Sequence, residues 1–479
     1  MTATEIIPDT TSEELDTALS AAQHAGPLLR RSSGAQRAAW LRAAGAAIGT
    51  HRTELVELAA RETHLDAGVL DGEVSRTIFQ LEHFARVAES PDVLGLVVEP
   101  ADADYPVAPR PDLVQALQPL GPVLVFTASN FPFAFSVAGN DTASALAAGC
   151  PVVVKANPGH PALSGRTAAI VVAAVSAAGA PAGTFGHIQG VDAGVAALTD
   201  PRIAACGFTG SVAGGRALFD LAVGRPDPIP FYGELGSLNP VFVTPAAASA
   251  RAAEIAAGFA TSFTFRGGQL CTKPGVLFAP ADFGIGNLAA QRISSAPVDL
   301  LTDRISAAYA EGTARLAGVP GATVHATGDA STPMLITVPA AVVLDSSVRL
   351  QECFGPAAVV VEYDDPAQLA ALADRIGPSL TATVHGEADD AVAIGLTPQL
   401  AGLAGRIIWN GWPTGVSVTR ALHHGGPYPA TTAPTYGSIG AGAIGRWLRP
   451  VSYQNWPREL LPEPVREAVA RNRDRALSG

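Results

Sequence analysis

The stretch VLVFTASNFPFAFSVAGNDTASALAAGCPVVVK, residues 123–155, decides the fold class of this 479-residue chain. It begins with a short apolar segment (123–128), continues with a small-residue segment of helical character (141–148) and ends with a second apolar segment (152–155). Short apolar strands that alternate with helices are typical of a parallel sheet covered by helices on both faces. We therefore predict an α/β architecture of the nucleotide-binding type.

The alternation continues on the C-terminal side of this stretch. The sequence predicts helix 163–178, strand 185–189, helix 192–199 and strand 204–209, which leads into a glycine-rich turn. A second series of expected strands and helices begins after Glu234, with the ranges 240–243, 246–263, 275–278, 357–363, 366–376, 379–384 and 405–409.

On the N-terminal side the sequence predicts helices. Thr11 and Glu14 form a capping-box pattern at the start of the first helix, and longer helical patterns cover residues 35–63 and 72–89. Residues 100–122 contain several prolines and are expected to be extended, and the tail from Gly426 is expected to form loops and an arm.

Length and composition restrict the class of protein. A chain of 479 residues is too long for one ordinary core, so we expect at least two domains. Only 15% of the residues are charged and 48% are hydrophobic, which excludes a largely disordered chain. The formal net charge of -12 argues against nucleic-acid binding.

Cysteine usage and the N-terminus indicate a cytoplasmic protein. Four cysteines in a chain of this length do not make a disulfide framework, and a reduced setting fits them better. The acidic N-terminal segment, residues 1–16, lacks the basic and apolar regions of an export signal. The alanine-rich run 167–183 is too short to span a membrane and is expected to be a buried helix.

Lysine is almost absent from the chain. Of 31 Lys and Arg residues only Lys155 and Lys273 are lysines. Because ammonium and guanidinium groups are not interchangeable, a chain that otherwise uses arginine can retain lysine where chemistry or space requires it. Compositional drift explains the scarcity but not the choice of these two positions.

Four motifs contain residues that can carry chemistry. The turn Gly207–Arg216 ends a strand and lets Ser211 cap the next helix, whose free N–H groups attract phosphate, although such turns are as often structural. Cys271 follows two glycines that leave its thiol accessible, whereas most cysteines are small core residues. Glu234 stands alone among glycines and apolar residues, so we expect a raised pKa and a general-base or capping role. Asn130 follows a strand, where sheet ligands gather in α/β folds and where turn-forming asparagines are also common.

In their order and separation these elements resemble the aldehyde dehydrogenase superfamily over nearly the whole chain. The matching elements are the Asn130 loop, Lys155, the Gly210-Ser211 turn, Glu234, Cys271 and the segment 352–356. Within the superfamily, the segments 156–161, 214–216, 271–275 and 449–457 are similar to the 2,5-dioxovalerate (α-ketoglutaric semialdehyde) dehydrogenase branch.

The resemblance implies a domain organisation. We expect two Rossmann-like parallel-sheet domains and a small oligomerisation arm. The cofactor domain would comprise residues 1–103 and 119–235, and the catalytic domain residues 236–425. Residues 104–118 and 426–479 would form the arm and tail of a homodimer or homotetramer.

The resemblance also implies the chemistry. Cys271 attacks the aldehyde carbon, Asn130 and the Cys271 backbone N–H hold the oxyanion, and hydride passes to a nicotinamide cofactor. Glu234 then activates the water that hydrolyses the thioester. Lys155 is expected at the adenosine ribose, and Glu352 and Phe354 at the nicotinamide riboside. Lys273 either lowers the pKa of the Cys271 thiol or forms a structural ion pair.

Charge favours NADP over NAD as the cofactor. NAD-preferring relatives usually carry a glutamate where this chain has Pro158, so no carboxylate repels a 2′-phosphate there. His160 and Arg216 are expected to pair with that phosphate, and Asn157, Gly210 and Ser211 complete the expected cofactor site.

The expected substrate site contains Arg266, Phe131 and Phe133. A semialdehyde with a carboxylate needs a cation, and Arg266 is a candidate by its position five residues before Cys271. It replaces the apolar residue expected in that branch. Phe131, Phe133 and Phe265 indicate an aromatic tunnel that would also suit a long-chain or aromatic aldehyde.

Three alternatives compete with a hydrolytic aldehyde dehydrogenase. A CoA-acylating enzyme would share Cys271 but would not need Glu234. A silent binding or structural protein on this fold should have lost Cys271 or Glu234. A zinc hydrolase is disfavoured because His423 and His424 lack metal-ligand spacing, so we expect no metal and a hydrogen-bonded structural role for these histidines.

Overall fold

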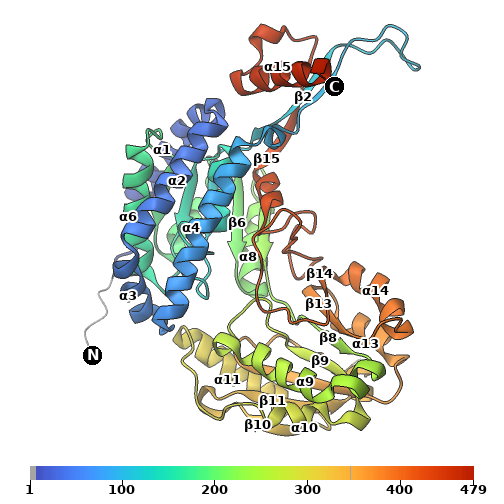
Figure 1. Ribbon diagram of the computed structural model, residues 1–479. Coiled ribbons are helices and arrows are strands. Elements are labelled where there is room, and N and C mark those ends of the chain that lie inside the picture. Colours follow the sequence, from blue (N-terminus) through green and yellow to red (C-terminus); the bar gives the residue numbers. More distant parts are fainter. Residues whose placement is uncertain (1–6, 346, 479) are drawn as a thin grey trace.

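The computed structural model describes residues 7–345 and 347–478, with side chains up to residue 471. The acidic N-terminal segment of the sequence analysis therefore lies partly outside the described residues. Within this part of the chain the strands form a five-stranded sheet, a seven-stranded sheet and a three-stranded sheet, each in its own region (Figure 1). The α/β class and the parallel sheets expected from the sequence are confirmed.

The five-stranded sheet contains the stretch 123–155 that begins the alternation. All its neighbouring strands are parallel, in the order β5-β4-β3-β6-β7. The strands are β3 Val123–Phe126, β4 Val152–Lys155, β5 Phe185–Ile188, β6 Ala205–Thr209 and β7 Phe231–Glu234. The connecting helices are α5 Asn140–Ala148, α6 Pro161–Ala177, α7 Val191–Thr199 and α8 Val212–Val223.

The N-terminal helices lie on both faces of this sheet: the first half of the first helix packs on one face, and the next three helices pack on the other. They are α1 Ser12–Arg31, α2 Gly34–Thr50, α3 Arg52–Thr63 and α4 Ala67–Glu89. The capping box at Thr11 and Glu14 is confirmed, because each donates a backbone N–H to the other's side chain. The single helix expected over 35–63 is wrong: the chain leaves helical geometry at His51, and α3 begins afresh after it.

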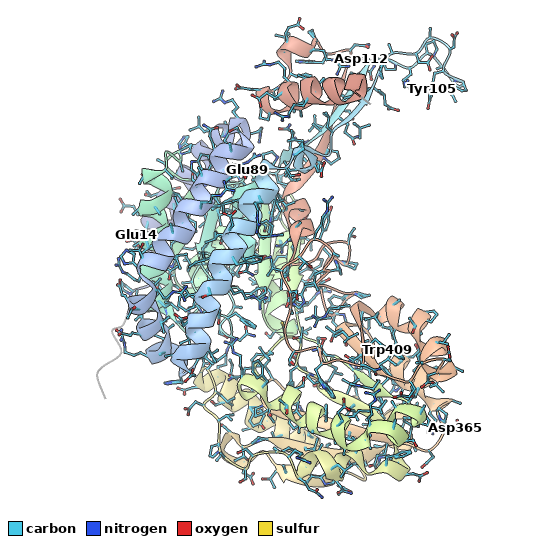
Figure 2. All side chains as sticks on the ribbon, in the orientation of Figure 1. Glu14, Glu89, Tyr105, Asp112, Asp365 and Trp409 are labelled. Atoms are coloured by element: carbon cyan, nitrogen blue, oxygen red, sulfur yellow. The ribbon has the colours of Figure 1, made fainter. Side chains whose placement is uncertain are left out.

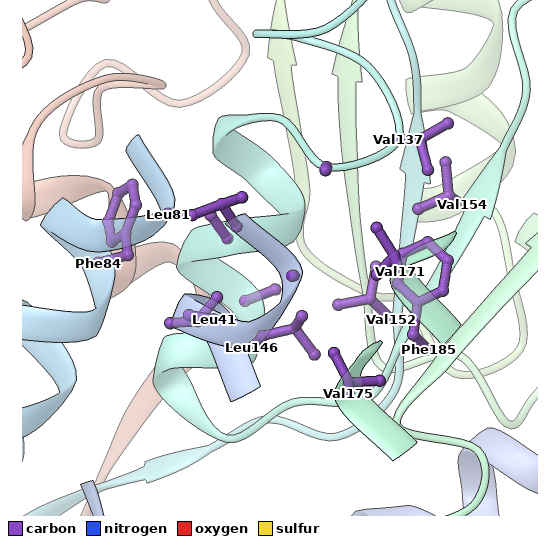
Figure 3. Close-up of a cluster of buried hydrophobic side chains, with 14 of the residues drawn as sticks. Leu41, Leu81, Phe84, Val137, Leu146, Val152, Val154, Val171, Val175 and Phe185 are labelled. Atoms are coloured by element: carbon purple, nitrogen blue, oxygen red, sulfur yellow. The ribbon is translucent and has the colours of Figure 1, made fainter. Parts of the chain in front are cut away.

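A continuous core joins these helices to the sheet. Leu41 of α2, Leu81 and Phe84 of α4, and Leu146 of α5 are at most 2% exposed. They belong to one buried cluster with Val152, Val154 and Phe185 of the sheet (Figure 3). This packing makes the sheet a rigid base from whose carboxyl edge the loops project.

The seven-stranded sheet has the order β10-β11-β12-β9-β8-β13-β14, and only its β10–β11 pair is antiparallel. The strands are β8 Val241–Val243, β9 Val276–Pro280, β10 Thr323–Thr327, β11 Met334–Pro339, β12 Ala357–Tyr363, β13 Ser379–His385 and β14 Ala404–Trp409. The helices are α9 Pro245–Thr264, α10 Ile285–Ala290, α11 Asp303–Ala317, α12 Ala340–Leu344, α13 Gln368–Ile376 and α14 Ala391–Leu403. Alternate residues of β9 and β12 point into two separate buried clusters, so both faces of the sheet are covered.

The arm is a three-stranded antiparallel sheet with one helix. Its strands are β1 Val97–Glu99, β2 Leu113–Pro119 and β15 Leu448–Gln454, with β2 in the middle. Helix α15 Glu463–Ser478 adds Val465 and Val469 to a small apolar cluster with Val114 and Ala116. Figure 2 shows Tyr105 at the far end of this projection and Trp409 and Asp365 on the unit of the seven-stranded sheet.

The tail after Gly426 is not only loops and arm, as the sequence analysis expected. The 3₁₀ helix Ala441–Trp447 packs into the first unit instead. Trp447 is fully buried, its indole N–H donates to Ser144 Oγ at 2.8 Å, and Arg446 forms a 2.6 Å ion pair with Asp141. None of the helices in the described residues combines the length and the apolar character that a membrane crossing requires.

Replacing Trp447 by Ala should destabilise the first unit strongly. A buried Trp→Ala change costs about 3–5 kcal/mol, which lowers a melting temperature by roughly 6–20 °C for a unit of this size. Differential scanning calorimetry measures the shift. Trp456→Ala is the control, because that side chain is 48% exposed and should change the melting temperature little. Equal shifts in the two variants would contradict the anchoring role of Trp447.

Candidate active site

Cys271 is presented by a tight turn that follows α9. The turn Phe265–Gly268 holds Arg266, Gly267 and Gly268 at φ values of 52°, 65° and 64°. A Cβ at Gly268 would lie 2.2 Å from the Gly355 carbonyl oxygen, so only glycine fits there. Cys271 is partly accessible in this arrangement, whereas Cys150, Cys206 and Cys353 are buried and all four are free thiols.

The amide of Asn239 holds the nucleophile segment in place. Its Nδ2 donates to the carbonyl oxygens of Cys271 at 2.8 Å and Lys273 at 2.9 Å. Its Oδ1 accepts from Ser237 Oγ and from the Thr381 N–H and Oγ1. Sequence reasoning missed Asn239, because nothing around it marks an asparagine that ties two distant segments together.

Lys273 does not face the thiol of Cys271. Its Nζ is buried and donates to the carbonyl oxygens of Cys353 and Ala357, both at 2.7 Å. The sequence analysis expected Lys273 either to lower the pKa of Cys271 or to form a structural ion pair. A structural role fits the contacts, but the partners of the ammonium group are carbonyl oxygens and not a carboxylate. The ammonium group fixes the loop that carries Glu352.

Glu234 ends strand β7 and points toward Cys271. It is 4% exposed, with Oε1 3.0 Å from His424 Nε2 and Oε2 accepting a hydrogen bond from Ser438 Oγ. Burial tends to raise the pKa of this carboxyl, but His424, Ser438 and Cys271 outweigh it and leave the pKa below its usual value. The expectation of a raised pKa is therefore wrong, because it assumed an apolar site without these partners.

His424 connects the carboxylate to the thiol. Its Nε2 is 3.6 Å from Cys271 Sγ, and the ligating atoms of Glu234, Cys271 and His424 lie within 4.8 Å of one another. The Ser438 N–H donates to the His424 carbonyl oxygen, which holds the loop across the site. The sequence analysis expected a purely structural role for His424. The structure instead places this histidine between Glu234 and Cys271, the expected base and nucleophile.

The Cys271 thiol has a high pKa in this setting. Burial raises the pKa of Cys271 well above its usual value, and the neighbouring Glu234 carboxylate raises it further. The Arg76 guanidinium acts in the opposite direction. The sulfur is therefore a thiol at neutral pH and needs a proton acceptor before it can act as a nucleophile.

Asn130 lies in the loop after β3, on the same side as the nucleophile. Its Nδ2 donates to the carbonyl oxygen of Gln269 at 3.0 Å, two residues before Cys271. An amide nitrogen has two hydrogens, so this contact leaves one N–H for another acceptor. The structure therefore brings Asn130, Glu234 and Cys271 together from three loops.

The expected cofactor residues lie at the carboxyl edge of the five-stranded sheet. Lys155 ends β4, and Gly210 and Ser211 follow β6, where the Ser211 side chain caps α8. Lys155 is 8% exposed, and within the described residues its ammonium group has no hydrogen-bond or ion-pair partner. A buried, unpaired ammonium and an exposed helix N-terminus fit the ribose hydroxyls and phosphates of a dinucleotide.

Glu352 approaches the same edge from the second unit. Its Oε2 accepts from the Ser237 N–H at 3.2 Å, and a Cβ on Gly236 would lie only 2.5 Å from it. Burial raises the pKa of Glu352 to about 7, while Lys273 acts to lower it. Phe354, two residues further on, is partly exposed beside this carboxyl.

Two residues expected to bind the cofactor, His160 and Asn157, form hydrogen bonds with other groups of the protein instead. His160 is fully buried, with Nδ1 3.0 Å from Ser164 Oγ and Nε2 3.0 Å from the Ala128 carbonyl oxygen. Burial lowers the pKa of His160, so a neutral imidazole cannot serve as the expected cation. Asn157 hydrogen-bonds to the Thr127 carbonyl oxygen and to the Gly159 N–H, which shapes the loop.

Two arginines remain near the expected adenosine end. Arg216 on α8 is 52% exposed and pairs with Asp220 at 2.7 Å. Arg304 at the start of α11 was not predicted, yet its charge acts on the pKa of Lys155. Asp9 acts on the same pKa in the opposite direction, so both signs of charge are present near Lys155.

The expected substrate residues are only partly together. Phe131 is partly exposed and packs 5.4 Å from Phe135, but Phe133 is 2% exposed in the first core and cannot line a tunnel. Phe265 is 51% exposed and lies in a surface hollow beside Trp412. Arg266 pairs with Glu73 at 3.2 Å, so its charge is already matched by a carboxylate.

Comparisons with known proteins identify the family of the chain. The sequence profile of the aldehyde dehydrogenase family matches residues 2–283. The chain is 43% identical to "Alpha-ketoglutaric semialdehyde dehydrogenase 2" of Azospirillum brasilense, over 92% of this chain and 87% of the relative. It is 39% identical to "Alpha-ketoglutaric semialdehyde dehydrogenase" of Acinetobacter baylyi, over 98% of this chain and 91% of the relative.

A similar fold occurs in solved structures. A 3,6-anhydro-L-galactose dehydrogenase in complex with NAP superposes with a TM-score of 0.79 and 21% identity, covering 93% of this chain and 92% of the other. A 1-pyrroline-5-carboxylate dehydrogenase from Thermus with bound NAD gives a TM-score of 0.78 and 20% identity, covering 93% and 86%. By its sequence profile and its relatives, the chain belongs to the aldehyde dehydrogenase family.

Proposed function

We propose that the protein oxidises 2,5-dioxovalerate, an aldehyde that carries a 2-oxo acid, to the corresponding dicarboxylic acid with a nicotinamide dinucleotide. The observation that carries the chemistry is the chain of contacts from Cys271 Sγ through His424 Nε2 to Glu234 Oε1. The names of the two relatives at 43% and 39% identity support the substrate.

The first half of the reaction uses Cys271. The Glu234 carboxylate is the proton acceptor: His424 Nε2, within reach of both groups, gives its hydrogen to Glu234 Oε1 as it takes the thiol proton, and Glu234 then releases that proton to solvent. The thiolate attacks the aldehyde carbon, and the free N–H of Asn130 Nδ2 and the backbone N–H of Cys271 stabilise the oxyanion. A nicotinamide held by Glu352 and Phe354 would supply the acceptor for the hydride that leaves the carbon, and the loss of that hydride would leave a thioester on Cys271.

The second half uses Glu234. Its pKa lies below the usual value, so the carboxylate is ionised at neutral pH and can accept a proton from water. Hydroxide attacks the thioester and releases the acid. A carboxylate that is already ionised can accept a proton from water without first losing its own. The presence of this water-activating base favours hydrolysis of the thioester over its transfer to CoA.

The cofactor would lie along the carboxyl edge of the first sheet. Lys155 would hold the adenosine ribose, the N-terminal end of α8 at Gly210 and Ser211 the phosphates, and Glu352 with Phe354 the nicotinamide riboside. NADP is favoured over NAD because Pro158 offers no carboxylate and because Arg216 and Arg304 supply positive charge nearby.

The proposal also covers the cellular environment and the oligomeric state of the protein. Four free thiols support a reduced, cytoplasmic environment. The arm of β1, β2, β15 and α15 has only a small apolar cluster of its own, which supports its use in a homodimer or homotetramer.

Replacing Cys271 by Ala should abolish aldehyde oxidation. The sulfur forms the covalent intermediate, and no other described thiol is accessible to take its place. Steady-state formation of reduced cofactor from 2,5-dioxovalerate measures the loss. Cys206→Ala and Cys150→Ala, in the two cores of the first unit, are matched controls that should retain most of the turnover. Full activity in Cys271→Ala would contradict the mechanism.

Replacing Glu234 by Gln should separate the two halves of the reaction. Thiohemiacetal formation and hydride transfer continue, so stopped-flow measurement should show a burst of about one reduced cofactor per subunit. Turnover should then fall on the order of a hundredfold or more because the thioester is not hydrolysed. Wild-type steady-state turnover in this variant, or its recovery with CoA alone, would instead support a CoA-acylating enzyme.

Replacing Arg216 by Ala should weaken NADP binding selectively. One lost charge-assisted hydrogen bond corresponds to on the order of tenfold to a hundredfold in the dissociation constant. Isothermal titration with NADP and with NAD measures both constants in the absence of aldehyde. Arg166→Ala, an exposed arginine on α6 paired with Glu54, is the control. Equal changes for both nucleotides would show that Arg216 does not contact the 2′-phosphate.

A further inference from the structure

Helix α4 carries an arginine, Arg76, beside the Phe131 ring, and the reaction described above does not use it. Arg76 lies one turn after the buried Glu73 on the same face of α4, and it is partly buried. Its Nε is shielded from solvent and has no hydrogen-bond partner within the described residues, and its guanidinium forms no ion pair with them.

Glu73 does not neutralise Arg76, because its oxygens already have other donors. Oε1 accepts the backbone N–H groups of Phe133 and Ala134, at 2.9 and 3.1 Å. Oε2 accepts from Arg266 Nη2 at 3.2 Å. The carboxylate thus fixes the Asn130 loop and pairs with Arg266, which leaves two guanidinium groups and one carboxylate in a partly buried cluster.

The same aromatic ring lies beside both arginines. The guanidinium carbon of Arg266 is 4.7 Å from the centre of the Phe131 ring, and that of Arg76 is 5.8 Å from it. Arg76 is also 6.0 Å from the Phe135 ring. Phe131 directly follows Asn130, whose amide contacts the nucleophile segment, so this cluster adjoins the reacting end of the site.

Arg76 and Cys271 also influence each other's ionisation. Burial lowers the pKa of Arg76, the Glu73 carboxylate acts to raise it, and so does Cys271 once its thiol has lost the proton. An arginine remains charged despite such a shift. A partly buried cation that lacks an ion-pair partner beside the reacting end of the site is costly unless an anion binds there.

We propose that Arg76 binds the carboxylate of the substrate and thereby selects aldehydes with an acidic group at the far end. This inference rests on the proposed function and assigns its substrate selection to one residue. In 2,5-dioxovalerate the aldehyde and carboxylate carbons are about 5 Å apart in an extended chain. The chain runs from Cys271 along Phe131 to the guanidinium, whose planar fork pairs with both carboxylate oxygens. Arg266, paired with Glu73, positions the Phe131 ring.

The test compares an acidic and a neutral aldehyde of equal length in matched variants. kcat/KM is measured for 2,5-dioxovalerate and for pentanal in the wild type, Arg76→Gln, Arg76→Lys and Arg86→Gln. Arg86 is on the same helix but 57% exposed and near Glu82, so its variant controls for the loss of a positive charge. Inhibition by glutarate reports binding of a dicarboxylate without turnover.

In Arg76→Gln, kcat/KM for 2,5-dioxovalerate should fall on the order of tenfold to a hundredfold, mainly through KM. The glutarate inhibition constant should rise by a similar factor, while pentanal oxidation changes less than threefold and shows that the enzyme is folded. Arg76→Lys should retain part of the preference, and Arg86→Gln all of it.

Three results would contradict the role of Arg76, and they distinguish an error in that role from an error in the proposed function. If the wild type prefers 2,5-dioxovalerate and Arg76→Gln keeps that preference, the role of Arg76 is wrong and the proposed function stands. If the wild type oxidises pentanal as well as 2,5-dioxovalerate, the proposed acidic substrate is wrong and the inference about Arg76 falls with it. Equal losses for both aldehydes in Arg76→Gln would make Arg76 a structural residue.

Discussion

The hydrogen bonds of one buried amide tie the crossing between the two parallel-sheet units to the nucleophile segment. Asn239 lies on the crossing from β7 to β8, five residues after Glu234, and its side chain holds the carbonyl groups of Cys271 and Lys273. The same side chain contacts Thr381 of β13. The relative position of the nucleophile and the base therefore depends on a side chain that touches neither reacting atom. An unsatisfied buried amide is costly, so this set of contacts is preserved as a whole.

Three carboxylates near this site have different roles because their hydrogen-bond donors differ. Glu73 accepts two backbone N–H groups and a guanidinium and is a framework residue. Glu234 accepts from His424 and Ser438 and stays ionised. Glu352 accepts one backbone N–H, and burial raises its pKa to about 7, so its charge responds to what binds near it. The same functional group thus serves three purposes because its neighbours differ.

Local patterns predicted most strands of the two parallel sheets but missed β7, β10 and β11, and long-range contacts limited the prediction of the site. The strands at 152–155 and 357–363 were located to the residue because short apolar runs flanked by turns depend on nearby sequence. The pairing of β2 with β15 joins segments more than three hundred residues apart, so no local pattern reveals it. The roles of His424 and Arg76 were missed for the same reason, since each is an ordinary loop or helix residue until the fold places His424 beside Cys271 and Arg76 beside Phe131. His160 was misjudged because a motif shows neighbours in sequence and not burial.

The placement of the two lysines bears on the stability of the enzyme toward the compounds that it oxidises. Primary amines condense with aldehydes to form Schiff bases, and guanidinium groups are far less nucleophilic because they stay protonated. Lys155 and Lys273 are 8% and 1% exposed, so no lysine amine is displayed on the protein surface. A surface of arginines retains positive charge and solubility without offering side-chain amines to a reactive carbonyl compound. The burial of both lysines thus protects their amines from condensation with the aldehydes that the enzyme oxidises.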